Sequence, residues 1–312
     1  MEYTITAPSR LHLGIFDVGG KEGQSFGAVG IALKKPRFTL SVRSSENFVS
    51  NNLKDYRIDE FTKRFSRCYN IGSKAEFSIC EEIPAHSGLG SGTQLALSVA
   101  TLLAELNGVK GTVSDLAKAM GRGRRSRVGT KIFENGGFVF DPGRNGKVQN
   151  FKVPLNWRFI LVNPRIEKGV SGAIEDSFFS SLKSDNGFSS QVTEIVLSKM
   201  IPSLKTSDII LFGESLTELD VLVGEYFRLA QKGTFRHPEI NEIIKKLKAL
   251  GCYGVGQSSW GPTVYGLTIL GEAENVLLKT RDFLQTRRLG GEVWVSEVQN
   301  FGAQIVKKNR IN

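Results

Sequence analysis

The chain has 312 residues, enough for two domains, and its 41 lysines and arginines against 31 aspartates and glutamates give a formal net charge of +10. A composition of 40% hydrophobic and 23% charged residues excludes disorder, and the lack of an apolar run of about 18 residues excludes a membrane-spanning helix. The three cysteines are scattered, which predicts a reduced, cytoplasmic protein without disulfides or a zinc site. The positive charge and the 34 glycines favour an anionic partner: a nucleic acid, an anionic membrane or a phosphorylated small molecule.

The first half of the chain predicts strands and helices in irregular order. We expect helices at residues 57–69, 93–106 and 114–120, and strands at residues 3–13, 28–33, 37–43, 75–80 and 136–141. The helix at 93–106 is almost continuously apolar, and Gly108 is placed to end it in the left-handed conformation. Residues 75–80 alternate between apolar and polar side chains, which is typical of a strand with one buried face.

The second half begins with a buried strand at 157–163 that Pro164 ends. We expect helices near residues 172–182, 189–199, 213–232, 238–250 and 272–286, strands at residues 252–256, 263–269 and 292–296, and a frayed tail at Lys307–Arg310. Strands and helices mix without strict βαβ alternation, so the sequence predicts an α+β fold in two domains, residues 1–155 and 156–312.

A glycine-rich loop precedes the helix at 93–106 and consists of Gly88, Leu89, Gly90, Ser91, Gly92 and Thr93. Its glycines allow a tight turn with exposed N–H groups, and the following helix N-terminus carries about half a positive charge. The loop therefore predicts phosphate binding, with a plain glycine turn capped by Thr93 as the alternative. It lacks the Gly-Lys-Ser/Thr of a Walker A loop, and the alternating strand before it differs from a Rossmann motif.

Residues 118–131 carry six lysines and arginines and no acid, so more than half of the net charge lies in this segment. Arg122, Arg124, Arg125 and Arg127 are interspersed with glycines. Guanidinium groups match phosphate oxygens in a bidentate fashion, whereas nucleic-acid binding calls for aromatic side chains among the arginines, and this segment has none. We interpret it as a site for a small molecule with several phosphates; a solvated basic loop is the alternative.

The loop at residues 256–262 lies between two short apolar segments and contains Ser258, Ser259 and Trp260. Glycines at both ends permit close approach of the backbone to a ligand. A tryptophan in so small a loop is costly to expose. The loop is either a second ligand-facing loop with Trp260 as a wall or a hairpin turn whose tryptophan packs on a neighbour.

The N-terminal segment places Arg10 and His12 on one face of a strand, followed by Asp17. Asp17 and Asp141 are the acids beside these loops that we consider for general-base or cation-stabilising chemistry. His86 precedes the glycine loop and either donates to an anion or lies in solvent.

These segments together resemble the β-ribofuranosylaminobenzene 5′-phosphate synthase family, within the GHMP kinase superfamily. The family's motifs are PSRLHLG, IPxHxGLGSGTQ, an arginine-rich block that runs into GGFxxDxG, and GQSSWGPTVYG; they correspond to residues Pro8–Gly14, Ile83–Gln94, Gly121–Gly143 and Gly256–Gly266. The chain departs from this pattern at one place: the family has glycine after the Arg-Ser pair, whereas Arg125-Ser126 is followed here by Arg127 and Val128. The matches run in order over most of the chain.

The resemblance implies a GHMP kinase-like fold, with an S5 domain 2-like N-terminal domain and a ferredoxin-like C-terminal domain. It implies condensation of phosphoribosyl diphosphate with 4-hydroxybenzoate or 4-aminobenzoate, with release of CO2 and diphosphate, a requirement for Mg2+, and a homodimer.

With that reaction in view, roles follow for the candidate residues. We expect Asp17, Asp141 and Arg125 to be catalytic, and Ser91 and Asp17 to hold Mg2+. The phosphate-binding residues would be Gly88, Leu89, Gly90, Ser91, Gly92, Thr93, Arg122, Arg124 and Ser126, and the substrate-binding residues Arg10, His12, His86, Ser258, Ser259 and Trp260.

Two alternatives stay open. The chain could be an ATP-dependent small-molecule kinase of the same superfamily, although such kinases usually continue the glycine loop with Ser-Ala-Ala where this chain has Gly92-Thr93-Gln94. The other alternative is a non-enzymatic nucleic-acid-binding protein on an S5-like domain, which a net charge of +10 allows.

Overall fold

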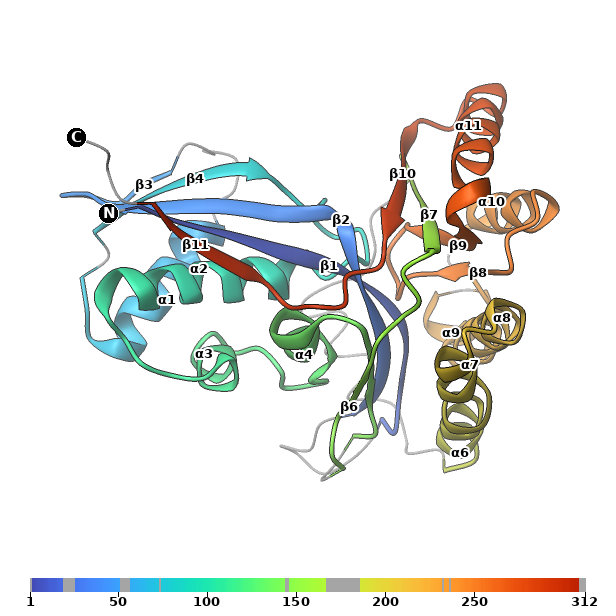
Figure 1. Ribbon diagram of the computed structural model, residues 1–312, viewed down its shortest axis with the longest axis horizontal. Coiled ribbons are helices and arrows are strands. Elements are labelled where there is room, and N and C mark those ends of the chain that lie inside the picture. Colours follow the sequence, from blue (N-terminus) through green and yellow to red (C-terminus); the bar gives the residue numbers. More distant parts are fainter. Residues whose placement is uncertain are drawn as a thin grey trace.

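The fold is built on two β-sheets that meet end to end (Figure 1). The computed structural model describes residues 2–18, 26–50, 57–72, 74–143, 146–166, 186–231, 233–235 and 237–308. The helix predicted at 172–182 lies outside these residues. The mixed α+β content is confirmed.

The first sheet has the strand order β11-β1-β2-β4-β3, and β5 and β6 extend it along the far end of β2. Its strands are β1 (Glu2–Phe16), β2 (Gly27–Ser44), β3 (Val49–Ser50), β4 (Ala75–Glu81), β5 (Phe138–Asp141), β6 (Gln149–Phe151) and β11 (Gln304–Lys308). All neighbours pair antiparallel except β3 and β4.

The prediction of two separate strands at 28–33 and 37–43 was wrong, because both belong to β2. Pro36 suggested a break, since proline cannot donate to a β-ladder. In the structure Pro8 of β1 pairs with Arg37 and Ser9 pairs with Leu33, so residues 34–36 form an irregularity that accommodates the proline. β2 thereby reaches from β4 at one end to β5 at the other.

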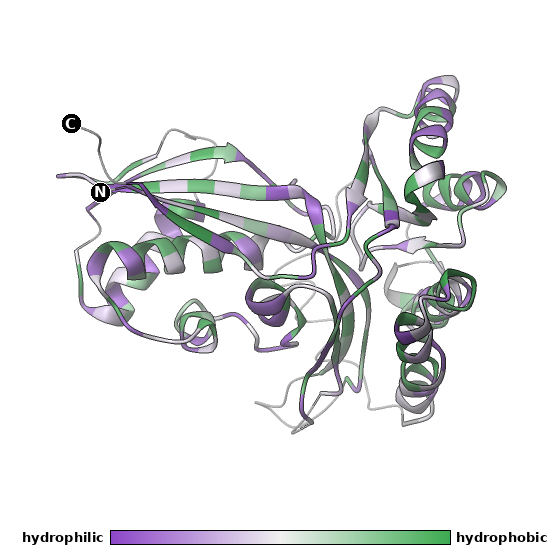
Figure 2. Ribbon diagram, viewed as in Figure 1, coloured by the Kyte–Doolittle hydropathy of each residue, from purple (hydrophilic) through white to green (hydrophobic). Residues whose placement is uncertain are grey.

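Helices cover one face of the first sheet (Figure 1). They are α1 (Arg57–Tyr69), α2 (Ser91–Asn107), α3 (Val113–Ala119) and α4 (Val128–Asn135). α2 has little hydrophilic colour in Figure 2 and is mostly buried, as its apolar sequence predicted. It ends as predicted at Gly108, which adopts φ 66° and donates its N–H to the carbonyl of Ala104.

The second sheet has the order β10-β7-β9-β8. Its strands are β7 (Trp157–Pro164), β8 (Gly254–Gln257), β9 (Val264–Ile269) and β10 (Gly291–Glu297), and its outer helices are α10 (Pro238–Ala249) and α11 (Leu270–Thr286). Apolar side chains on one face of these strands pack with both helices in a cluster of their own, whereas Trp157, Phe159, Leu161, Tyr265 and Leu267 belong to the core of the first sheet. The predicted elements of this region all appear, with shifted ends.

A second group of helices lies beside this sheet: α6 (Asn186–Glu194), a π-helical segment (Ile195–Met200), α7 (Ile201–Thr206), α8 (Ile209–Tyr226) and α9 (Arg228–Gln231). Phe212 of α8 contacts Trp157 of β7 and Phe138 of β5, with ring centroids 4.9 and 6.1 Å apart. α8 therefore packs against both sheets and helps to hold them together. The single helix predicted at 213–232 is interrupted at Phe227.

The C-terminal residues return to the first sheet. Lys307 pairs with Tyr3 and Lys308 with Glu2, so the prediction of a frayed tail was wrong for these two residues; 309–312 lie outside the described residues. The last strand of the predicted second domain, β11, thus completes the first sheet and lies beside the start of β1 (Figure 1). Within the described residues, no helix is long and apolar enough to cross a membrane. The predicted domain boundary and the homodimer stay predictions.

Candidate functional site

Three of the four motif segments meet where the two sheets join. The backbone N–H of His12 on β1 donates to Ser258 Oγ at 3.0 Å, and Ser258 Oγ donates to the carbonyl of Gly88 at 2.9 Å. The N–H of Ser259 donates to the carbonyl of His12 at 3.0 Å. One buried serine thus connects the N-terminal strand, the glycine loop and the loop at 256–262.

The glycine loop and the 256–262 loop approach each other so closely that no side chain fits between them. Gly88 has φ +86°, and a Cβ there would lie 2.2 Å from the carbonyl oxygen of Ser258. A Cβ on Gly261 would lie 2.3 Å from the nitrogen of Gly88. Glycine is required at both positions, because a real Cβ does not come this close to backbone atoms.

The start of α2 and two arginines form a concave, positively charged site, which we call the glycine-loop cradle: residues 88–93 with the side chains of Arg10 and Arg122. Gly90 precedes the helix with φ 77° and offers no side-chain cap; its carbonyl accepts the N–H of Thr93 at 3.1 Å, so the N–H groups of Ser91 and Gly92 are the ones left to face a ligand. Arg10 lies against Gly90, where a Cβ would come within 2.6 Å of its Cγ. A Cβ on Gly92 would lie 3.8 Å from Nη1 of Arg122.

Arg122 is a partly buried cation in this cradle. Its guanidinium lies 5.2 Å from the ring centroid of Phe61, and burial, together with the charge of Arg64, lowers the pKa of Arg122. Among the described residues, its Nε and the buried Oγ1 of Thr130 have no hydrogen-bond partner. Buried polar atoms without partners are costly, so an anion in the cradle would satisfy them.

The other residues of the arginine block have different surroundings. Arg124 is exposed, Ser126 Oγ accepts the N–H of Val128 at 3.3 Å, and the carbonyl of Arg125 accepts the N–H of Phe26 at 2.6 Å. Arg122 lies at the start of α2, and the roles assigned to Arg124, Arg125 and Ser126 stay predictions.

Asp141 is a buried carboxylate that is paired with the arginine block. It is 0% exposed, accepts the backbone N–H and Nε–H of Arg127 at 2.8 and 3.2 Å, and pairs with the same guanidinium through its second oxygen. It also accepts the N–H of Gly143 at 3.0 Å. Through these bonds Asp141 anchors the arginine block, and the catalytic role assigned to Asp141 stays a prediction. Arg127, the departure from the family pattern, is its partner.

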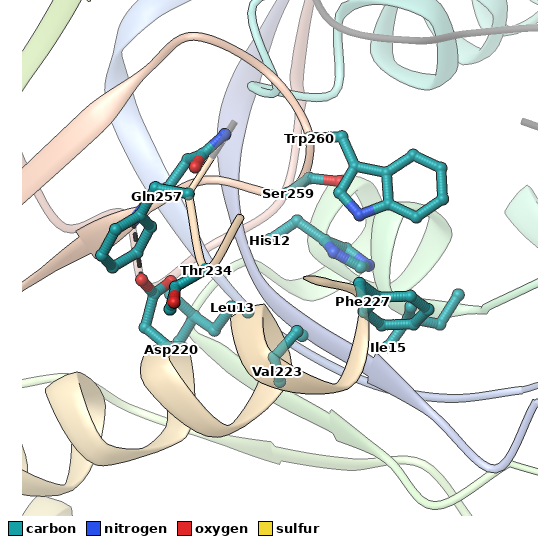
Figure 3. A pocket seen from close by; sticks show the side chains of 13 residues that line it. His12, Leu13, Ile15, Asp220, Val223, Phe227, Thr234, Gln257, Ser259 and Trp260 are labelled. Carbon is teal, nitrogen blue, oxygen red and sulfur yellow. Dashed lines mark hydrogen bonds between the residues drawn. The ribbon is translucent and has the colours of Figure 1, made fainter. Parts of the chain in front are cut away.

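A pocket lies beside the cradle (Figure 3). We call it the junction pocket; it is lined by His12, Leu13, Gly14, Ile15, Asp220, Val223, Gly224, Phe227, Thr234, Phe235, Gln257, Ser259 and Trp260. Trp260 is 9% exposed and meets Phe227 edge to face, with centroids 5.5 Å apart. Trp260 therefore both packs on a neighbour and forms a wall, so the two interpretations of its loop do not exclude each other.

Asp220 on α8 is the functional candidate that sequence reasoning missed. It is 6% exposed, lines the junction pocket, and accepts hydrogen bonds from the N–H of Gln257 at 3.0 Å and the hydroxyl of Tyr265 at 3.2 Å. Burial raises the pKa of Asp220 to about 8, against the effect of both hydrogen bonds. Helical spacing could have revealed it, because Asp220 falls eight residues after Phe212 and four after Leu216, on the buried face.

Comparison with known proteins identifies the family. The GHMP kinases N terminal domain matches residues 57–132, and the GHMP kinases C terminal domain matches residues 200–285. The β-ribofuranosylphenol 5′-phosphate synthase of Methanothermobacter thermautotrophicus is 33% identical over 301 residues, covering 86% of this chain and 89% of its own length. The chain belongs to the β-ribofuranosylphenol 5′-phosphate synthase family.

Other comparisons agree with this assignment. The synthase of Methanocaldococcus jannaschii is 28% identical over 96% of this chain and 99% of its own length. A crystal structure of homoserine kinase from Cytophaga hutchinsonii superposes with a TM-score of 0.69 at 19% identity, covering 98% of this chain and 97% of that one. The GHMP kinase-like fold is therefore confirmed, and the kinase alternative has less support than the synthase.

The remaining candidates lie at the edges of the synthase-family site. Asp17 is half-buried at the end of β1 with φ 52°, and its N–H donates to Ser189 Oγ of α6 at 3.0 Å. His86 is exposed with φ 59° and does not line the junction pocket. His12 is buried, and burial together with the charge of Arg10 holds the pKa of His12 well below 6.5. The roles assigned to Asp17 and His86 stay predictions.

Asp220 should make the stability of the protein depend on pH. The folded state holds a proton on this carboxyl up to about pH 8, whereas the unfolded chain releases it near 3.8. The stabilising contribution of Asp220 is therefore complete below about pH 4 and is lost as the pH rises through about 8. Between about pH 4 and pH 8, the free energy of unfolding of Asp220→Asn, which cannot ionise, should rise by several kcal/mol relative to that of the wild type. Urea unfolding at about pH 4, 6, 8 and 9 measures this; a stability difference that is constant with pH would contradict it.

Proposed function

We propose that this chain condenses phosphoribosyl diphosphate with 4-hydroxybenzoate, forming a carbon–carbon bond to the ribose and releasing CO2 and diphosphate. The observation that carries the proposal is the adjacency of the cationic cradle and the half-apolar junction pocket, which share β1 and the 256–262 loop. A donor with phosphates and an aromatic acceptor need two such sites side by side. The curated relatives with 28–33% identity are named for a ribofuranosylphenol phosphate product, which favours the phenol over the aniline acceptor.

The cradle would hold the diphosphate of the donor. The N–H groups of Ser91 and Gly92 at the start of α2 and the guanidinium groups of Arg10 and Arg122 would face it. When the bond between C1′ and diphosphate breaks, negative charge grows on the leaving group and positive charge on the sugar. Fixed donors that stabilise such charge each contribute about a hundredfold to a thousandfold in rate in enzymes studied by mutation.

Mg2+ fits this site as a partner of the donor's phosphates. Among the described residues no group of three or more His, Cys, Asp or Glu could hold a metal alone. Mg2+ commonly binds through substrate phosphates, waters and only one or two protein oxygens. Ser91 at the start of α2 is the oxygen donor of the cradle that we propose for it. Asp17, the other predicted ligand, follows the end of β1, seven residues beyond Arg10, and its role stays a prediction. Bound there, the ion would neutralise the departing diphosphate.

The junction pocket would bind the aromatic ring between the apolar side chains of Val223, Phe227 and Trp260. The ring carbon that bears the carboxylate attacks C1′, and the loss of CO2 restores aromaticity. A pocket that excludes water protects the cationic sugar from hydrolysis.

One incubation tests the reaction as a whole. The protein is mixed with phosphoribosyl diphosphate, Mg2+ and 4-hydroxybenzoate labelled in its carboxyl group. We expect labelled CO2 and diphosphate in equal amounts. No CO2 release, together with ATP consumption in the presence of an alcohol acceptor, would overturn the proposal in favour of a kinase.

Arg122 offers a direct test of the cradle. We expect Arg122→Ala to raise the KM for phosphoribosyl diphosphate by about tenfold to a hundredfold, because a hydrogen bond to a charged group contributes about 1.5–3 kcal/mol. Steady-state kinetics with varied donor measures this. Arg43→Ala is the matched control, since Arg43 forms an exposed pair with Glu76 on the first sheet. Equal KM values for both variants would remove Arg122 from the donor site.

A further inference from the structure

We propose that Asp220 is the base that accepts the proton of the acceptor's para hydroxyl group. This inference rests on the proposed function and assigns a catalytic role to a residue of the C-terminal half, outside all the motifs identified in the sequence. It makes the junction pocket a site for phenols in particular, since the carboxylate lies where the substituent opposite the reacting carbon would be.

The position of the carboxyl group is firmly defined. Its two oxygens accept the N–H of Gln257 on β8 and the hydroxyl of Tyr265 on β9, at 3.0 and 3.2 Å. Gly256 makes this approach possible, because a Cβ there would lie 2.5 Å from Asp220 Cγ. A carboxylate oxygen can accept more than one hydrogen bond, so a substrate hydroxyl can be added.

The polar side chains Asp220, Thr234 and Gln257 lie on one side of the junction pocket, with Leu13 beside Asp220, and this asymmetry would orient an aromatic acid (Figure 3). Ile15, Phe227 and Trp260 gather on the other side. The carboxylate of a benzoate would be repelled by Asp220 and attracted by Arg10 of the cradle. The para hydroxyl then points to Asp220, and the carboxylate-bearing carbon points toward the donor.

Asp220 is the group in the pocket lining that titrates near neutral pH. His12 from β1 is held neutral, because burial and Arg10 lower its pKa well below 6.5. Tyr265 from β9 is held neutral by burial and by the neighbouring Asp220, which raise its pKa well above 10. Gln257 from β8 and Thr234 carry no charge, and burial raises the pKa of Asp220 itself to about 8. A base with such a pKa suits removal of a phenolic proton.

The proton and the electrons balance in this scheme. Asp220 takes the hydroxyl proton, and the oxygen's electron pair moves through the ring to the carboxylate-bearing carbon, which bonds to C1′ while diphosphate leaves with the C–O bonding pair. The bond to the carboxylate then breaks, CO2 departs, and its electron pair returns through the ring to the oxygen. Asp220 gives the proton back, so the product is a neutral phenol and the base is restored.

The test compares two acceptors in Asp220→Asn, which keeps the shape of the side chain. We expect the rate with 4-hydroxybenzoate to fall about a hundredfold or more, and the rate with 4-aminobenzoate to fall less than tenfold, because an amino group supplies its lone pair without losing a proton. The wild-type kcat/KM for 4-hydroxybenzoate should rise with pH through about 8, and this dependence should disappear in the variant. Equal losses for both acceptors would overturn the proposal.

Two further variants separate catalysis from folding. Tyr265→Phe removes a hydrogen bond that lowers the pKa of Asp220, so we expect the pH dependence of kcat/KM to move upward. This shift decides the question if Asp220→Asn fails to fold, and an unmoved profile counts against the proposal. Asp208→Ala removes the N-terminal cap of the same helix and should lower the melting temperature without changing the ratio of the two acceptor rates. Wild-type protein that releases no CO2 from either acceptor would refute the proposed function instead.

Discussion

Gly88→Ala is expected to abolish activity and to destabilise the protein by about 2–5 kcal/mol. A left-handed backbone costs an L-residue about 1–2 kcal/mol, and overpacking adds about 1–3 kcal/mol. Gly88 has both problems, because φ is +86° and a Cβ would lie 2.2 Å from the Ser258 carbonyl oxygen. The new methyl group would push the 256–262 loop off the glycine loop and separate the cradle from the junction pocket. Urea unfolding and CO2 release measure the two effects.

Gly251→Ala is the matched control for this variant. Gly251 has nearly the same φ, +85°, but nothing lies within 4 Å of a Cβ placed on it. It should therefore cost only the backbone term, about 1–2 kcal/mol, and leave activity intact. If the two variants behaved alike, the contact between the two loops would have no importance for the site.

Asp141→Asn is expected to lower the free energy of unfolding by about 3–5 kcal/mol, because it breaks a buried ion pair and leaves the charge of Arg127 uncompensated. The same change should disturb the start of α4, because Arg127 directly precedes its first residue, Val128. This helix start packs on the glycine loop: a Cβ on Gly129 would lie 3.1 Å from Cγ2 of Thr93. Glu81→Gln provides the comparison. Glu81 forms a bidentate pair with Arg37 but is 41% exposed, so its loss should cost at most about 1 kcal/mol.

Chemical denaturation of both variants measures these costs. Equal losses would mean that burial adds nothing to the Asp141–Arg127 pair. A stable Asp141→Asn protein with normal substrate affinity but no turnover would instead support the catalytic role that the sequence had suggested for this residue.

Features with a local cause could be predicted from the sequence. The apolar course of α2 and the left-handed Gly108 that ends it depend on neighbouring residues, and both appear in the structure. The glycine loop was also visible locally, since glycine density and the helix start lie within a few residues of each other. The sequence therefore identified which segments to combine, and the structure brings three of them to one point through Ser258.

Features that depend on distant contacts could not be predicted in this way. Pro36 indicated a strand end, but the irregular pairing between β1 and β2 accommodates it. Asp141 and Arg127 are close enough in sequence to be suspected as a pair, yet only the structure shows that Asp141 is completely buried and bound to Arg127. Asp220 becomes significant only because β8 and β9 cover α8, and no motif marks it.

The pairing of β11 with β1 has a consequence for the order in which the chain can fold. Residues 304–308 supply the edge partner of β1, so the first sheet stays incomplete until these residues have left the ribosome. Until then β1 presents unpaired N–H and C=O groups along Glu2–Thr6, and such an open edge invites pairing with other chains. The nascent protein must therefore protect this edge throughout synthesis of the second sheet, and the last strand closes it.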